Sequence, residues 1–339
     1  MESFKGNYPK ILKEFGLTGT ELRRDKTGHI FSTARGPVLI QKPRGSKEQL
    51  LFAHYVKESL HKAGFAETDR FIVTDAGSPF CEIGEDVYTA VLALGSDLKE
   101  TRFDDAISVA AAARTVARMH NLAAKHGFFC NFPSKTPRRK EYTAFTTTGG
   151  FENHLKTMQG YKKMLKKRNR LSDFDVLFLK HFDGYERLVT SGSELVTQAG
   201  AGQSLQKVIF SHNMLKEETL TVLAGKTYIT GFDECSGDHY LFDLASLIKR
   251  YVRTAAEPTQ SGLAAILQAY CSQNPLDTHG IKVLYAILLF PDKFYKTCVK
   301  YYSKKRSWTP ASFNISAEGL NGQNDAGFRL INDFFNVHV

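Results

Sequence analysis

The hydrophobic pattern of this 339-residue chain changes its period once, close to residues 94–97. Before that point, apolar and polar residues alternate in short runs that are bounded by turn residues, which is typical of β-strands. After it, apolar residues recur every three to four positions in long runs, which indicates amphipathic helices. A strand-rich segment followed by a helical one predicts an α+β fold with two parts.

The N-terminal part is expected to contain four strands and one helix. The helix follows Ser46, a favourable N-cap residue, and ends at Gly64. The strands are predicted at residues 28–33, 37–42, 70–74 and 87–93. We therefore expect residues 1–95 to form a small β-rich lobe and residues 96–339 to form a larger helical lobe.

The C-terminal part is expected to contain helices that are interrupted by two short strands. An alanine-rich helix begins after Asp105 and ends at Gly127, residue types that favour the two ends of a helix. The two strands are predicted at residues 207–210 and 226–230. Further helical patterns cover residues 151–168, 174–189, 241–253, 262–272, 281–290, 294–303 and 325–335.

The formal net charge of +10 calls for a hypothesis about partners. Much of the excess lies in two runs, of which the first covers residues 135–140. The second contains Lys156, Lys162, Lys163, Lys166, Lys167, Arg168 and Arg170. Such a run is either a solvated helix face or a dock for an acidic protein surface, nucleic acid or another polyanion. No nucleic-acid-binding motif accompanies it, so no nucleic-acid partner is expected.

Other features exclude several classes of protein. The five cysteines are scattered and lack metal-ligand spacing, so no zinc site is predicted. No apolar run approaches the roughly 20 residues that cross a bilayer, and no membrane partner is expected. The first residues, MESFKGNYPKILKEFG, lack the apolar core of a signal peptide, so we expect synthesis in a cytoplasm.

Several motifs along the chain resemble those of one family. IFSH (209–212) is followed by the hairpin pattern TVLAGKTYIT, by GFD (231–233) and by LFDLA (241–245). The segment LLFPDKFYKTCVKYYSKKRSWTP (288–310) resembles a "P-x-K-[FW]…YY…k-x-x-W" segment of CotS-type spore-coat proteins. The chain is similar to that family from about residue 10 to residue 335. CotS-type proteins belong to the choline kinase and aminoglycoside phosphotransferase clan.

The resemblance implies a bilobal protein-kinase-like fold, with a β-rich N-lobe and a larger helical C-lobe. Active members of the clan carry the loop motif H-G-D-x-x-x-x-N, then a β-hairpin, then D-F-[DE]. Aligned from His212, the Asp position of the loop holds Met214 and the Asn position holds Thr219. Gly231 replaces the metal-binding Asp of D-F-[DE]. A thioether accepts no proton and hard cations require oxygen ligands, so neither a catalytic residue nor a metal site is expected.

Some positions of the family pattern keep a usable side chain. The resemblance places Lys42 at the position of the phosphate-binding lysine, with Glu48 or Glu58 of the following helix as its partner. It also implies that His212 and Asp243 are retained as the scaffold that braces the catalytic loop.

One route to restored metal binding remains open in the sequence. Asp233 lies two residues after Gly231 and would face the same way on a strand. It would act with Glu217 or Glu218 of the loop. Asp233 and Lys42 together would line a vestigial nucleotide site.

Three functional readings follow from the resemblance. The first is an inactive kinase-like protein, or pseudokinase, without a cofactor. It would be made in the mother-cell cytoplasm, enter the spore coat and bind other spore-coat proteins. The second is an active phosphotransferase for a small molecule that uses ATP and magnesium through relocated ligands. The third is a sensor that binds a nucleotide or another ligand without turnover.

Overall fold

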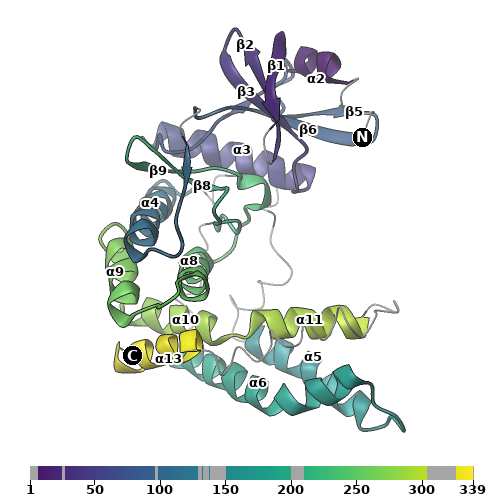
Figure 1. Cartoon of the computed structure of the whole chain (residues 1–339), viewed down its shortest axis with the longest axis vertical. Coiled ribbons are helices and arrows are strands. Elements are labelled where there is room, and N and C mark those ends of the chain that lie inside the picture. The colour runs from purple at the N-terminus through teal and green to yellow at the C-terminus, as the bar shows by residue number, and fades with distance from the viewer. Residues whose placement is uncertain are drawn as a thin grey trace.

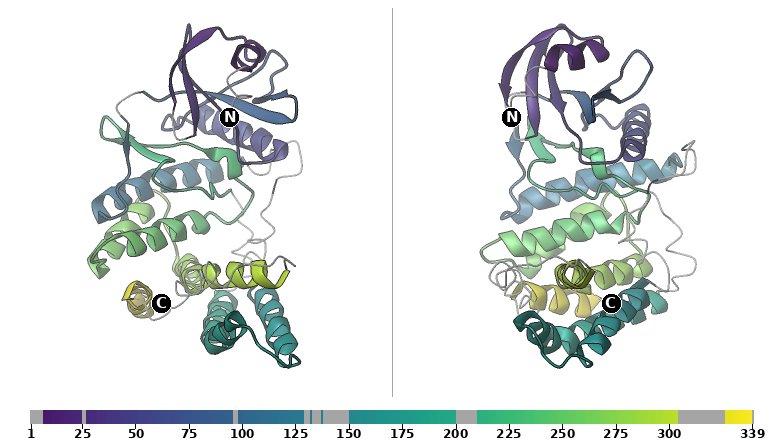
Figure 2. Two further views of the ribbon diagram at one scale, coloured as in Figure 1. Left: turned by 45° about the vertical axis from the view of Figure 1, so that its right-hand side comes forward. Right: turned by 90° about the vertical axis from the view of Figure 1, so that its right-hand side faces the viewer.

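A computed structural model of the chain describes residues 7–24, 27–95, 98–128, 132, 137, 150–199, 210–303 and 326–338. A β-sheet with two helices lies at one end of the molecule, and helices form most of the rest (Figure 1). Two further views show the same separation, with α5 and α6 at the end opposite the sheet (Figure 2). The predicted α+β class is confirmed. Within the described residues, each helix is too short or too polar to cross a membrane.

The main sheet is antiparallel and has the order β1-β2-β3-β6-β4, with β5 paired to β6. All four predicted strands are present, whereas β1 and β5 were not predicted. All six residues of β1 are exposed, so this edge strand carries no alternating apolar pattern. The strands are β1 (Gly19–Arg24), β2 (Gly28–Thr33), β3 (Gly36–Gln41), β4 (Phe71–Ile72), β5 (Phe80–Ile83) and β6 (Asp86–Leu92).

The two faces of the sheet serve different purposes. Val38 and Ile40 of β3 are buried in one core cluster with α2 (Tyr8–Glu14). Because side chains alternate along a strand, Leu39 and Gln41 point to the other face, where they border a cavity. The helix α3 (Lys47–Lys62) begins with a capping box at Ser46, as its sequence predicts, and packs in the larger core cluster.

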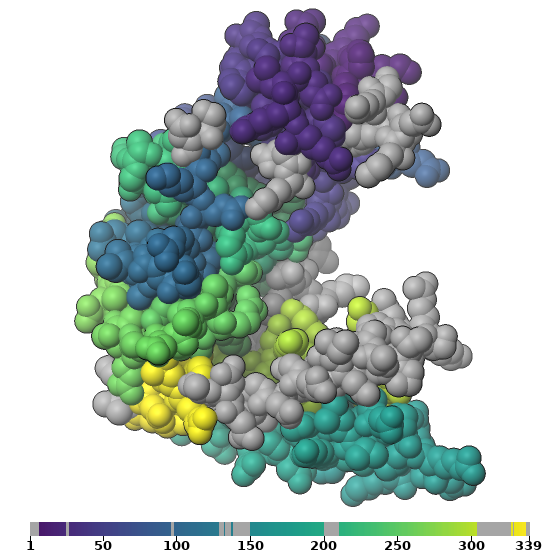
Figure 3. Space-filling view, in the orientation of Figure 1, coloured from purple at the N-terminus to yellow at the C-terminus, as the bar shows by residue number. Residues whose placement is uncertain are grey.

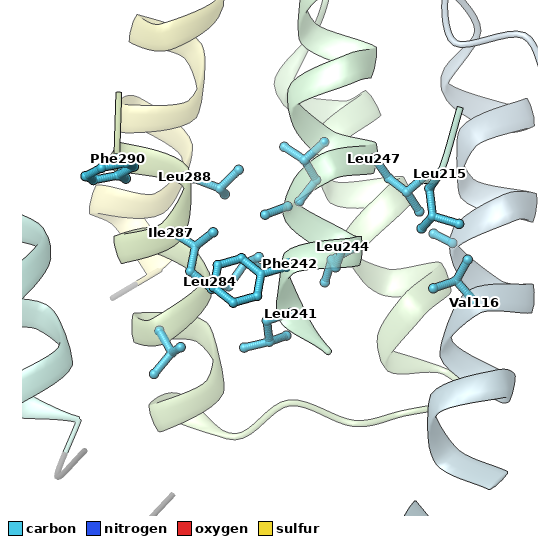
Figure 4. Close-up of a cluster of buried hydrophobic side chains, with 14 of the residues drawn as sticks. Val116, Leu215, Leu241, Phe242, Leu244, Leu247, Leu284, Ile287, Leu288 and Phe290 are labelled. Atoms are coloured by element: carbon cyan, nitrogen blue, oxygen red, sulfur yellow. The ribbon is translucent and has the colours of Figure 1, made fainter. Parts of the chain in front are cut away.

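The helical part is built around α8 (Leu241–Thr254). Figure 4 shows its apolar side chains between those of α10 (Thr278–Leu289) and α4 (Ala106–Lys125). Asp105 caps α4 as predicted, with its carboxylate accepting from two backbone N–H groups. The remaining elements of this part are α9 (Gln260–Cys271), α13 (Ala326–His338) and the three-stranded sheet of β7 (Lys99–Glu100), β8 (Leu220–Leu223) and β9 (Lys226–Ile229).

At the far end, α5 (Gly150–Leu165) and α6 (Asp173–Gln198) pack against each other beneath α11 (Asp292–Ser303). A space-filling view shows the molecule hollowed between the sheet and this helix pair (Figure 3). The predicted strand at 207–210 falls largely outside the described residues, and Phe210 itself is not in a strand. The strand-like pairing comes one residue later, as a bridge between Ser211 and Ser236.

Candidate functional site

A cleft separates the main sheet from the β8–β9 hairpin. It contains a cavity of about 290 Å³ and, next to it, a smaller one of about 140 Å³. The sheet contributes an apolar wall of Ile30, Leu39 and Val91 to the larger cavity. The helical part contributes a polar wall of Thr219, Thr221, Thr230 and Gly231.

One buried carboxylate holds the loop that leads into this cleft. Asp243 Oδ1 accepts from Ser211 Oγ and from the Asn213 backbone N–H, each at 2.9 Å. Its Oδ2 accepts from the His212 backbone N–H at 2.7 Å and lies 3.0 Å from His120 Nε2. Burial alone would raise the pKa of Asp243, but the hydrogen bond from His120 and the other donors outweigh it and lower the pKa. Asp243 is therefore an ionised brace for the loop.

The imidazole of His212 is a second brace. Its Nε2 lies 2.9 Å from the Thr230 carbonyl oxygen, and the Met214 backbone N–H donates to its Nδ1 at 3.2 Å. Since Nδ1 accepts, Nε2 carries the proton and the ring is neutral. Burial lowers the pKa of His212 to about 4, which fits this neutral form. Both nitrogen atoms are engaged by backbone groups, so His212 has a structural role.

Thr219, at the position of the family's metal-binding Asn, stabilises the loop through its hydroxyl. The Thr219 hydroxyl donates to the Met214 carbonyl and accepts from the Lys216 backbone N–H at 3.0 Å. These bonds close the loop on itself. They also engage the only oxygen that Thr219 offers from its side chain.

The side chain of Thr219 lies where a side chain at residue 231 would begin. Gly231 is left-handed, with φ 71° and ψ 47°. A Cβ atom at this position would lie 2.8 Å from the Thr219 Cγ2 methyl. A side chain at residue 231 therefore requires Thr219 to move, so the two departures from the family pattern are packed together.

Asp233 does not lie where the sequence predicted it. Residues Phe232–Glu234 form a 3-10 turn and not a strand, so Asp233 does not share a strand face with Gly231. Its carboxylate accepts a hydrogen bond from the Arg44 backbone, and burial raises its pKa. Gly45 is also close, since a Cβ there would lie 1.8 Å from the Asp233 carbonyl oxygen. Asp233 thus ties this turn to the segment before α3. With Lys42 it nevertheless borders the smaller cavity, as the sequence predicted for these two residues.

The two loop glutamates are bound by basic side chains. Glu217 pairs with Arg250 of α8 at 2.9 Å and borders neither cleft cavity. Glu218 borders both cavities and pairs with Lys216 at 3.2 Å. Across the described ranges, no group of three or more His, Cys, Asp or Glu residues is placed to hold a metal ion. The acidic residues that border the smaller cavity are Glu218, Asp233 and Glu234.

Lys42 has a partner that the sequence did not predict. Its ammonium bonds Asp86 Oδ2 at 2.6 Å and lies 5.5 Å from the centre of the Tyr88 ring, which is part of the α2 cluster. The prediction of a glutamate partner was wrong: Glu58 pairs with Arg70 at 2.5 Å, and Glu48 is exposed.

Lys42 follows Gln41, and it is Gln41 that lies on the cleft face of β3. Gln41 borders both cleft cavities, while Lys42 borders the smaller one alone. The residue of β3 that faces the cleft is therefore the neutral Gln41. A lysine at this position could bind phosphate groups through its charge, which an amide lacks.

A buried cation at the back of the cleft was missed. Lys57 of α3 is 1% exposed, and its ammonium lies 2.8 Å from Asp69 Oδ1 and 4.2 Å from the centre of the Phe71 ring. Its position could have been read from the sequence. Ala53, Val56, Lys57 and Leu60 share one helix face, so the lysine interrupts an apolar stripe. Asp69 already neutralises this charge.

The basic segment lies on α5 and on the turn that follows it. Two of its seven cations are engaged within the molecule: Lys162 pairs with Asp183 and Arg168 pairs with Asp175, each at 2.9 Å. The other five are exposed and make no ion pair with the described residues: Lys156, Lys163, Lys166, Lys167 and Arg170. The first basic run, at residues 135–140, lies outside the described residues apart from Pro137.

Comparisons with known proteins decide the family. The family model described as "Spore coat putative kinase YutH" matches residues 9–330. The chain belongs to this family. The predicted resemblance to a kinase-like spore-coat family is therefore confirmed. No curated protein sequence matches the chain.

Solved structures show that this spore-coat protein has the phosphotransferase fold. An aminoglycoside phosphotransferase from Alicyclobacillus acidocaldarius is similar, with a TM-score of 0.72 at 14% identity over 97% of this chain and 94% of that one. A spectinomycin phosphotransferase, solved with ADP and spectinomycin, gives 0.62 at 11% identity over 96% and 97%. A choline kinase from Cryptosporidium parvum gives 0.52 at 12% identity over 99% of each chain. The predicted bilobal kinase-like fold is confirmed.

Proposed function

We propose that this protein is a non-catalytic member of its family that acts in the spore coat by binding other coat proteins. The observation that carries the proposal is the packing of Thr219 against Gly231, because it fills the place of two metal-binding side chains at once. Met214 adds the loss of the proton acceptor. The spore-coat description of the family supports synthesis in the mother cell followed by assembly into the coat.

The exposed basic residues of α5 and of the turn that follows it are the proposed dock for a partner. Lys156 and Lys163 are seven residues apart and so lie on one face of α5, and Lys166 and Lys167 follow directly after its end. The helix α5 lies at the end of the molecule away from the sheet (Figure 2). A concentration of one sign of charge attracts a surface of the opposite sign and speeds its association. The partner surface is therefore expected to be acidic.

Reversal of this charge tests the proposed dock. We expect the double variant Lys163→Glu/Lys167→Glu to reduce incorporation of a fluorescently tagged protein into the spore coat. A matched variant, Lys10→Glu/Lys226→Glu, changes net charge equally at exposed positions elsewhere and should leave incorporation unchanged. Both proteins should melt close to the parent temperature, since exposed substitutions have small effects on stability. Equal incorporation of the two variants would contradict this dock.

The larger cleft cavity favours a second candidate, a ligand sensor without turnover. Its volume of about 290 Å³ and its apolar wall of Leu39 and Val91 suit a flat ring system. The Thr221 hydroxyl beside it is buried and has no hydrogen-bond partner among the described residues. A thermal-shift titration with ATP in EDTA tests this candidate, with Leu39→Trp as the variant that fills the cavity. A shift that Leu39→Trp removes supports a sensor, and no shift in either protein rejects nucleotide sensing.

A further inference from the structure

A third cavity, of about 220 Å³, lies beside α8 and shares no lining residue with the two cleft cavities. We call it the α8 cavity. Its residues on α8 recur at intervals of three to four, so they form one face of the helix. Figure 4 shows Phe242 of α8 directed towards Ile287 of α10, which belongs to the opposite wall. The residues that matter here are Phe242, Ser246, Lys249, Arg253, Ile287 and Phe290.

Lys249 brings a half-buried cation to this cavity. Its ammonium donates to the Ile287 and Phe290 carbonyl oxygens, at 2.9 and 3.2 Å, at the C-terminal end of α10. An ammonium has three N–H groups, so one remains for the cavity after these two bonds. Burial lowers the pKa of Lys249 to about 8. A nearby anion would stabilise its charged form.

Two arginines add donors to the same wall. Arg250 is held through Nη1 by Glu217, but its Nε–H is buried and has no hydrogen-bond partner among the described residues. Arg253 lies one turn beyond Lys249, is exposed, and forms no ion pair within the described part of the chain. Like charges four residues apart on a helix repel each other, which a bound anion would relieve.

The cations that border the cavity outnumber the carboxylates by one, since Asp243 and Asp292 stand against Lys249, Arg250 and Arg253. Asp292 pairs with Lys296 at 3.1 Å and also favours the charged form of Lys249. Glu217 pairs with Arg250 from outside the cavity. The wall therefore keeps a small positive excess next to the apolar side chains of Phe242, Ile287 and Phe290.

We propose that the α8 cavity binds a small anionic molecule, whose phosphate or carboxylate group is received by Lys249, Arg250 and Arg253. Arginine and lysine donors make charge-assisted hydrogen bonds with both groups. The volume equals about seven water molecules, which limits the ligand to the size of a sugar phosphate or a short dicarboxylate. The body of the ligand lies against the three apolar side chains. The proposal does not depend on whether the cleft is catalytic.

Calorimetric titration of the full chain at constant ionic strength tests this proposal. The titrants are inorganic phosphate, glucose 6-phosphate, succinate and, as the uncharged control, glucose. We expect saturable binding of at least one anion with one site per chain and no binding of glucose. Phosphate and succinate as separate titrants show which of the two anionic groups the cavity prefers.

Two variants locate the site without disturbing the core. Arg253→Gln removes an exposed charge and should weaken binding about tenfold. Ser246→Leu fills the cavity without a change in charge and should abolish binding of glucose 6-phosphate. Lys10→Gln on α2 removes one exposed positive charge outside the cavity and should leave the affinity unchanged. The proposal is overturned if no anion binds up to about 10 mM, or if binding survives both α8 variants.

Discussion

The two sides of the loop at residues 211–219 differ in which side chains of the family pattern they retain. The inner side is complete, because Asp243 receives four donors and His212 bridges two backbone groups. The side towards the cleft holds Met214 and a threonine that bonds its own loop, and this threonine packs against Gly231 of a later segment. The comparison teaches that the bracing of a kinase-type loop does not require the Asp and Asn of the family's loop motif.

The largest effect is expected from removal of the inner brace. Asp243→Ala leaves the His120 ring and three other donors without their acceptor in a buried site, which should lower the free energy of unfolding by about 3–5 kcal/mol. On the cleft side, Asp233→Asn keeps an acceptor for the Arg44 backbone and should cost less than about 1 kcal/mol. Urea denaturation of both variants measures the difference. Equal losses would remove the distinction between the two sides.

The next effect is a loss of stability in mild acid. His212 and His239 are buried and neutral, and burial lowers the pKa of each from 6.5 to about 4. Between these values the unfolded chain binds more protons than the folded one, so stability is full above pH 6.5 and falls as the pH is lowered towards 4. The loss should approach about 3 kcal/mol for each ring.

Urea denaturation between pH 7 and pH 4 measures this loss. His239→Asn keeps an acceptor for the Leu241 N–H and does not titrate, so it should remove about half of the pH dependence. An unchanged slope in this variant would show that other groups cause the acid sensitivity.

A smaller effect on stability is expected where Thr219 packs against Gly231. Gly231→Asp alone places a Cβ against the Thr219 methyl and should cost about 1–3 kcal/mol. The double variant Thr219→Asn/Gly231→Asp lacks this methyl group. Its loss of stability should therefore be smaller than the sum of the two single losses, by a coupling energy of about 1 kcal/mol. A double-mutant cycle from denaturation curves supplies the value. Additive effects would mean that the two positions are independent.

Much of the fold could be predicted from the sequence, and particular residues show where prediction stops. The capped helices after Ser46 and Asp105 follow from local residue types, whereas the exposed strand β1 has no periodicity to detect. The positions Met214, Thr219 and Gly231 were identified from the resemblance to the family motif. Their packing against one another depends on a left-handed backbone that spacing does not encode.

Predictions about partners across the cleft were the least successful. To predict the partner of Lys42, one must know which face of β3 meets the cleft. To predict the partner of Glu58, one must know that Arg70 lies beside α3. Asp233 was predicted to share a face with Gly231 because the two are two residues apart. That inference holds only for an extended chain, and residues 232–234 form a 3-10 turn. These contacts join segments far apart in the sequence, so local pattern carries no record of them.

The most direct test of the central claim is the magnesium dependence of ATP binding, measured by calorimetry on the full chain. If the cleft binds no metal ion, as the proposed non-catalytic function requires, ATP should bind equally weakly, or not at all, in magnesium and in EDTA. A gain in affinity of about tenfold or more with magnesium, abolished by Asp233→Asn, would contradict the account. It would make this protein a phosphotransferase with relocated ligands.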